Sequence, residues 1–198
     1  MKLFCSLTSP YARKVRVTAR EKGLASRIEE LVCVPQQSAE LRRSNPLGKV
    51  PALLLDDGLA LYDSPVICEY LDSLAPQPRL LPDGRERWLI KRAEALADGV
   101  LDAAVACVME ARRPDGERSP GAVSHWRGQI TRALAEMDEQ LPELPDALNL
   151  GLIAFGCALG YVDLRHADLQ WRDHHPGLAL WFERFGARPS MVETRAPG

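Results

Sequence analysis

Two Ser-Pro pairs in the first 80 residues place hydroxyl groups where an anion could be bound. Ser9 precedes one proline, and Ser64 precedes another. Serine is a favoured helix N-cap, and proline at the first helical position loses no hydrogen bond, because its missing N–H would have had no partner there. Each pair therefore predicts a serine-capped helix. A helix N-terminus favours anions through its unpaired N–H groups and its dipole, so two such ends could hold a thiolate and a carboxylate.

Short strand and helix patterns alternate over the first 80 residues and would position these serines. The strand patterns cover Lys2–Ser6, Ile28–Val34, Val50–Leu55 and Leu59–Tyr62, and the helix patterns cover Pro10–Lys22, Ser38–Ser44 and Pro65–Leu74. Asp56-Asp57-Gly58, between the last two strands, is a strong hairpin signal. The order β-α-β, then α, then β-β-α predicts an α/β domain of the thioredoxin-like type over residues 1–76.

A proline-rich break at 77–83 is the predicted linker, and everything after it has helical patterning. Apolar residues recur every three or four positions over about 89–108 and again over about 126–141, which predicts two long helices with one buried stripe each. The next predicted helix, Leu150–Arg165, is apolar nearly all round and is expected to be central. Residues 84–198 are therefore predicted to form an all-α domain.

Composition and charge limit the function classes. The chain has 198 residues, of which 46% are hydrophobic and 26% charged, so it can bury a real core. A net charge of −2 gives no basic footprint for nucleic acid. The uncharged stretch Ala147–Val162 is shorter than a membrane span of ~20 residues. We expect neither a nucleic acid nor a membrane as partner, and instead a small solute or a protein.

The five cysteines, at positions 5, 33, 68, 107 and 157, form no Cys-x-x-Cys pair and have no metal-ligand spacing to the four histidines. This pattern favours a reducing compartment and predicts no metal site. The first residues, Met1 to Phe4, lead directly into a strand pattern without the apolar region of a signal peptide. The expected location is cytoplasmic.

Three segments, in this order and at these separations, carry a family resemblance: Ser9–Val15, Asn45–Pro51 and Tyr62–Pro65. They resemble the three glutathione-contacting segments of the glutathione transferase family, whose first domain is thioredoxin-like and whose second is helical. The segment Gly156–Tyr161 extends the resemblance over most of the chain. The resemblance implies a transferase that stabilises the thiolate of glutathione, its co-substrate, and conjugates it to a small electrophile in detoxification.

The resemblance also implies a role for each site residue. Ser9 should donate a hydrogen bond to the glutathione sulfur, with Thr8 and Tyr11 as competitors. Val50, before a proline that is cis in the family, should pair its backbone with the tripeptide.

In the same way, Asp63 should meet the ammonium of the γ-glutamyl end and Ser64 its carboxylate, while Lys49 stands where relatives place a polar side chain. Simple N-caps, an edge-strand proline and a solvated lysine are the alternative interpretations of these residues. Lowering a thiol pKa from about 8.5 to about 6.5 needs only about 2.7 kcal/mol, which one charge-assisted hydrogen bond and a helix N-terminus could supply.

Other features are open to more than one interpretation. Relatives form homodimers, and Asp98 resembles an aspartate that some of them extend across the dimer axis; a solvated helix charge is the alternative. The conceivable contributors to an electrophile pocket are Met109, Arg112, Tyr161 and Arg165. Three arginines of the first predicted helix, at 13, 16 and 20, are expected on a solvated face.

The sequence departs from the family at two further places. Asn149 and Leu152 stand where relatives often have the capping box of the buried helix. The residues 36–38 include no lysine for the glycyl carboxylate. Two other functions stay open: a non-catalytic binding module of the same fold, and a glutathione-dependent thiol redox enzyme using Cys5, against which a catalytic serine argues.

Overall fold

A four-stranded sheet organises the first part of the chain in the computed structural model, which describes residues 1–197. The strands are β1 (Lys2–Cys5), β2 (Glu29–Val32), β3 (Ala52–Leu54) and β4 (Ala60–Leu61), in the spatial order β2-β1-β3-β4. β1 runs parallel to β2 and antiparallel to β3, and β4 is antiparallel to β3. All four predicted strands are present, each shorter than its apolar pattern.

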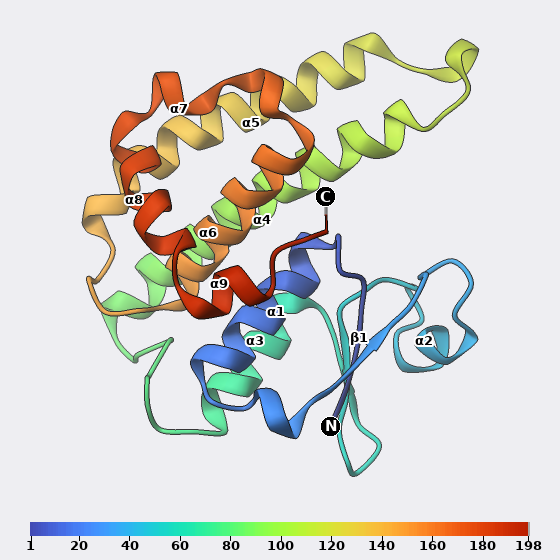
Figure 1. The fold of residues 1–198 in the computed structure, drawn as a ribbon, viewed down its shortest axis with the longest axis vertical. Coiled ribbons are helices and arrows are strands. Elements are labelled where there is room, and N and C mark those ends of the chain that lie inside the picture. Colours follow the sequence, from blue (N-terminus) through green and yellow to red (C-terminus); the bar gives the residue numbers. More distant parts are fainter. Residues whose placement is uncertain (198) are drawn as a thin grey trace.

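Helices cover both faces of this sheet. α1 (Pro10–Glu21) and α3 (Ser64–Ser73) lie side by side on one face, and the short α2 (Ala39–Ser44) lies on the other (Figure 1). Side chains of β1 alternate accordingly: Leu3 and Cys5 join the large core under α1, whereas Phe4 packs with Leu41 of α2. The predicted thioredoxin-like arrangement is confirmed.

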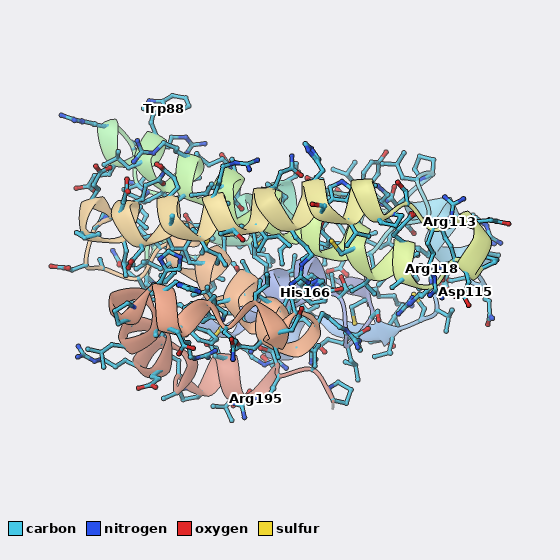
Figure 2. The ribbon with its side chains drawn as sticks, turned by 90° about the horizontal axis from the view of Figure 1, so that it is seen from above. Trp88, Arg113, Asp115, Arg118, His166 and Arg195 are labelled. Carbon is cyan, nitrogen blue, oxygen red and sulfur yellow. The ribbon has the colours of Figure 1, made fainter. Side chains whose placement is uncertain are left out.

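The rest of the chain is helical, as predicted. Its helices are α4 (Arg85–Ala111), α5 (Pro120–Gln140), α6 (Leu150–Arg165), α7 (Trp171–His174), α8 (Pro176–Gly186) and α9 (Pro189–Glu193), with short 3-10 turns between several of them. The tip of the α4–α5 hairpin, with Arg113, Asp115 and Arg118, protrudes from the molecule (Figure 2). The helix α6 is central: 12 of its 16 residues are buried, and it packs on both α4 and α1. Its N-cap is Asn149, whose Oδ1 accepts a hydrogen bond from Leu152 N at 3.0 Å, so asparagine replaces the missing capping box.

The segment 77–83 is packed against both parts of the chain. Lys22 of α1 donates from Nζ to Asp72 Oδ1 at 2.8 Å, to the Ala75 carbonyl at 2.7 Å and to the Pro78 carbonyl at 2.5 Å. The carboxylate of Asp72 also accepts hydrogen bonds from the backbone N–H groups of Leu80 and Leu81, both of which are buried. These hydrogen bonds from Lys22 and to Asp72 therefore hold the segment 77–83 in place.

The predicted solvated arginine face of α1 is wrong. Arg16 is 7% exposed, and its Nε lies 2.7 Å from Glu30 Oε2 of β2. Arg20 pairs with the same glutamate, and Arg13 donates from Nη2 to the Met191 carbonyl at 3.0 Å. The helical part of the chain and β2 enclose α1, so its charged residues find partners that lie far away in the sequence. No helix among residues 1–197 combines the length and the apolar character needed to cross a membrane.

Candidate functional site

The sheet topology brings the three predicted site segments to one edge. β1 ends at Cys5 and leads through a short loop into Ser9. Because Phe4 is paired with Ala52, the preceding Val50 and its proline lie beside the end of β1. β4 is antiparallel to β3, with Leu61 opposite Leu53, so the chain leaves β4 at this same edge and enters α3 at Ser64.

Ser9 is the N-cap of α1, as predicted. Its Oγ accepts a hydrogen bond from Ala12 N at 3.2 Å, and its own N–H donates to the Ser6 carbonyl at 3.0 Å. A hydroxyl that accepts one hydrogen bond still has its proton to donate, and no other described residue takes it. Capping and donation to a ligand are therefore compatible at this residue.

The two competing hydroxyls are placed differently. The Tyr11 hydroxyl donates to Asp102 Oδ1 of α4, and burial together with this hydrogen bond raises the pKa of Tyr11 well above its usual value. Thr8 is exposed, and its hydroxyl lies 3.3 Å from Ser6 Oγ. Among these side chains, only Ser9 combines a helix N-terminus with an uncommitted proton.

The turn before β3 is held by a buried asparagine. Asn45 Nδ2 donates to the Lys49 carbonyl at 2.8 Å, and Asn45 Oδ1 accepts from Leu47 N at 3.0 Å. The peptide bond between Val50 and its proline is cis, as the resemblance implies. Neither backbone polar group of Val50 is hydrogen-bonded to another of residues 1–197, so both are available to an extended ligand. The Lys49 side chain is exposed.

The start of α3 differs from the prediction by one residue. Asp63, not Ser64, is the N-cap, and its side chain makes no capping hydrogen bond. Asp63 is exposed and has no ion pair with residues 1–197, whereas Ser64 is 1% exposed. Since neither side chain satisfies the first-turn N–H groups, this helix end keeps its capacity for an anion, with an acidic side chain next to it.

A cavity of about 650 Å³ lies beside Ser9. Its walls come from the β1–α1 loop, the start of α1, the C-terminal half of α6, the helix α8 and the segment 192–196. Of the four residues predicted for an electrophile pocket, Tyr161 lines this cavity, and Met109, Arg112 and Arg165 do not. Val50, Asp63 and Ser64 also lie outside its walls, so the edge segments and the cavity adjoin each other at Ser9.

Asp98 is engaged within its own chain. Both of its carboxylate oxygens accept hydrogen bonds from Lys14 Nζ of α1, at 2.8 and 2.7 Å, and Glu94 Oε1 accepts another at 3.1 Å. Burial opposes the charge on Lys14, but the two carboxylates outweigh it and raise its pKa. Burial also raises the pKa of Asp98, against the attraction of Lys14 and with help from Glu94 and Asp102. The carboxylate of Asp98 is therefore not free in this chain for the cross-subunit role that the resemblance implies.

The thiols are poor nucleophiles in this environment. Burial, with a smaller effect of Glu30, raises the pKa of Cys5 to about 11, and burial raises that of Cys157 to about 11 as well. A thiol with such a pKa is almost fully protonated at neutral pH. The geometry therefore favours Ser9 over Cys5 as the group that acts on a sulfur ligand.

Comparisons with known proteins identify the family of this chain. The family model "Glutathione S-transferase, N-terminal domain" matches residues 8–74, and "Glutathione S-transferase, C-terminal domain" matches residues 120–184. The chain is 35% identical to the uncharacterized GST-like protein YibF of Escherichia coli K12, covering 100% of this chain and 99% of that protein. It is 30% identical to a stringent starvation protein A homolog of Histophilus somni, covering 98% and 89%.

Solved structures are similar over the whole chain. A glutathione transferase family member from Pseudomonas fluorescens Pf-5, with bound glutathione, has 41% identity and a TM-score of 0.92, covering 100% of this chain and 99% of that one. The same family member with bound S-(propanoic acid)-glutathione superposes with a TM-score of 0.91 over 100% of both chains. The chain belongs to the glutathione S-transferase family.

Proposed function

We propose that this protein is a glutathione transferase that stabilises the thiolate of bound glutathione and conjugates it to a small electrophile. One observation carries the proposal: the Ser9 hydroxyl, the unpaired backbone of Val50 and the uncapped start of α3 meet at one sheet edge next to a cavity of about 650 Å³. Cavities of this size are typical of small-molecule sites. An extended peptide along the edge would direct its sulfur toward the cavity.

In this proposal each residue meets one part of glutathione. Val50, in the turn before β3, pairs its N–H and C=O with the peptide backbone, in the way that main-chain hydrogen bonds hold other extended peptide ligands. The first turn of α3, with Ser64, receives the γ-glutamyl carboxylate, and Asp63 receives the ammonium beside it. Lys49 is exposed in the turn before β3, next to Val50, and supplies a positive charge near the tripeptide.

Ser9 is the proposed catalytic residue. Its proton is uncommitted, and it caps a 12-residue helix whose N-terminus favours negative charge. A charge-assisted hydrogen bond from the hydroxyl, together with this helix end, is of the size needed to ionise most of the bound thiol at neutral pH. The thiol proton passes to solvent, and the thiolate attacks the electrophile in the cavity.

We also propose a cytoplasmic homodimer whose glutathione-binding part is residues 1–76 and whose helical part is residues 84–198. The family resemblance implies association through α3 and α4. Apolar side chains exposed on both helices support this arrangement: Val66 is 47% exposed, and Trp88, which projects away from the molecule in Figure 2, is 70% exposed. A single-chain mass by light scattering at micromolar concentration would contradict it.

A non-catalytic binding module is the second candidate, because the relatives include a stringent starvation protein A homolog as well as transferases. Calorimetric titration with glutathione and turnover of a general electrophile such as 1-chloro-2,4-dinitrobenzene separate the two. The transferase binds glutathione saturably, turns the electrophile over and loses affinity in Asp63→Asn or Ser64→Ala. Glu29→Gln, at an exposed residue of β2, is the control. Absence of binding at millimolar glutathione would contradict the transferase proposal.

A further inference from the structure

The cavity beside Ser9 has an uneven charge distribution. Three arginines, at 13, 172 and 195, line it together with two acidic residues, Asp163 and Glu183. Arg172 already has partners: its Nη2 lies 2.7 Å from Asp163 Oδ2, and its guanidinium stacks on Trp171 at 4.5 Å. The hydrogen bond to Asp163, and to a smaller extent the charges of Asp163 and Glu183, raise the pKa of Arg172 against the effect of burial. Asp163 therefore neutralises Arg172, whereas Glu183 has no ion pair within the described residues, and three arginines against two carboxylates leave the wall with one net positive charge.

Arg13 has no carboxylate partner among residues 1–197. Its Nη2 donates to the Met191 carbonyl, and its guanidinium rests against Gly160 of α6, where a Cβ would lie 2.5 Å from Nη1. Arg13 follows Ser9 by one helical turn, and its N–H donates to the Ser9 carbonyl at 2.9 Å. Side chains four residues apart share a helix face, with Cβ atoms about 5–6 Å apart.

Arg195 adds a second positive charge to the wall of this cavity. It lies on the C-terminal segment at the edge of the molecule (Figure 2), is exposed, and has no ion pair within the described part of the chain. The cavity wall thus carries two guanidinium groups without an ion-pair partner, against the one unpaired carboxylate of Glu183, and Arg13 is a single turn from the proposed thiolate position.

We propose that the electrophile of this enzyme carries a carboxylate, and specifically that it is a short α,β-unsaturated carboxylate whose acid group is bound by Arg13 and Arg195. The inference rests on the proposed function and names its substrate class. The glutathione thiolate forms a bond to the β-carbon, the C=C π electrons move onto the α-carbon and the carboxylate, and water then protonates the α-carbon. In the shortest such product two carbons separate the sulfur from the carboxylate, and Arg13 follows Ser9 by one helical turn.

The arginines address the chemical difficulty of this reaction. A carboxylate is a weak activating group for addition, because the attack places a second negative charge on a group that is already anionic. Guanidinium groups held at that position stabilise the developing charge without reorganising, which is the most effective form of electrostatic catalysis. Arginine also matches a carboxylate through two parallel N–H donors.

The test compares two conjugates by calorimetry: S-(2-carboxyethyl)glutathione and its neutral amide, S-(2-carbamoylethyl)glutathione. The wild-type protein should bind the acid about tenfold more tightly than the amide, the value of one charge-assisted contact of about 1.4 kcal/mol. The acid-to-amide preference should fall below about threefold in Arg13→Gln and in Arg195→Gln. Arg184→Gln, at an exposed arginine of α8 outside the cavity wall, is the matched control and should keep the preference.

The outcomes separate the inference from the function on which it rests. Equal binding of acid and amide by the wild-type protein, or a preference that survives in both arginine variants, overturns the carboxylate proposal and leaves the transferase proposal intact. Failure of glutathione itself to bind overturns both. Arg195 is exposed, so its variant keeps the test decisive if Arg13→Gln misfolds.

Discussion

Lys14 and Asp98 join the two parts of the chain through a buried ion pair. Lys14 Nζ lies 2.8 and 2.7 Å from the two carboxylate oxygens, and the lysine side chain is fully buried between α1 and α4. Glu94, which is also buried, shares Lys14 with Asp98 and is itself paired with Lys91 at 2.8 Å. The helix that presents Ser9 is therefore fixed to the helical part by charge as well as by apolar packing.

Removal of Lys14 should be costly, because it leaves two buried carboxylates with too little compensation. We expect Lys14→Met to lower the free energy of unfolding by about 3–5 kcal/mol. The double variant Lys14→Met/Asp98→Asn should be more stable than the sum of the two single changes predicts, since it removes one of the orphaned charges. Urea unfolding of the four proteins measures the coupling. Strict additivity would contradict the proposed interaction.

Replacement of Ser9 by alanine should change the chemistry more than the affinity. In Ser9→Ala the bound thiol loses the proposed hydrogen bond, so its pKa should rise toward about 8.5, the value of a free thiol. Glutathione affinity should change little, because the proposed contacts of Val50 and Ser64 are untouched. Ultraviolet absorbance of the thiolate against pH, measured on the complex, gives the result; an unchanged titration would transfer the role to the backbone N–H groups of α1.

The link between α1 and α9 should be lost in acid. Hydrogen bonds from Arg188, and to a smaller extent Ser190, hold the pKa of Glu21 below its usual value against the effect of burial. A lowered pKa stabilises the fold fully above the unfolded-state value of about 4.3, and this stabilisation disappears as the pH falls through the folded-state pKa.

Glu21→Gln should therefore be about 1 kcal/mol less stable than wild type at pH 7, a modest value because Arg188 is partly exposed. The difference should shrink at pH 3. Urea unfolding at both pH values measures it, with Glu29→Gln as the control that shows no difference at either. If the difference in unfolding free energy between Glu21→Gln and wild type is the same at both pH values, the Glu21 carboxylate is not its cause.

Two glycines of α6 should respond differently to alanine. A Cβ at Gly156 would lie 2.7 Å from two ring carbons of Phe185, whose ring stacks on Trp181, so Gly156→Ala should cost about 1–3 kcal/mol through overpacking. A Cβ at Gly160 would lie 2.5 Å from Arg13 Nη1, the far end of a flexible side chain, and at an ordinary contact distance of 3.7 Å from Phe182 Cζ. Gly160→Ala should leave stability nearly unchanged while it displaces that guanidinium; urea unfolding compares the two, and the reverse order would refute this account.

Local signals predicted the elements well. The Ser9 cap, the hairpin before α3 and the all-round apolar character of α6 are visible within short windows, and each appears in the structure where it was expected. The one-residue error at Ser64 is of the size expected for helix ends. That these elements come together at one site was predicted from the family resemblance.

The charged partners of α1 were not predictable in the same way. Lys14 meets a glutamate 80 positions away, and Arg13 meets a carbonyl 178 positions away. A basic helix face looks solvated in the sequence, because no local pattern reveals what will pack on it. The cavity wall formed by 192–196 was missed for a related reason: those residues are mostly irregular, and only the tertiary fold brings them to Ser9.

The contacts of α1 also restrict how this chain can exchange parts with its relatives. Besides Lys14 and Arg13, Arg20 reaches Glu193 and Glu21 reaches Arg188, so four residues near the start and the end of one helix are matched to positions scattered through the helical part of the chain. Recombination near residue 80 would join mismatched partners at several of these points, whereas a single proteolytic nick between residues 77 and 83 would leave the fragments associated. The two parts look like separable modules along the chain, but the residues that join them have to change together in evolution.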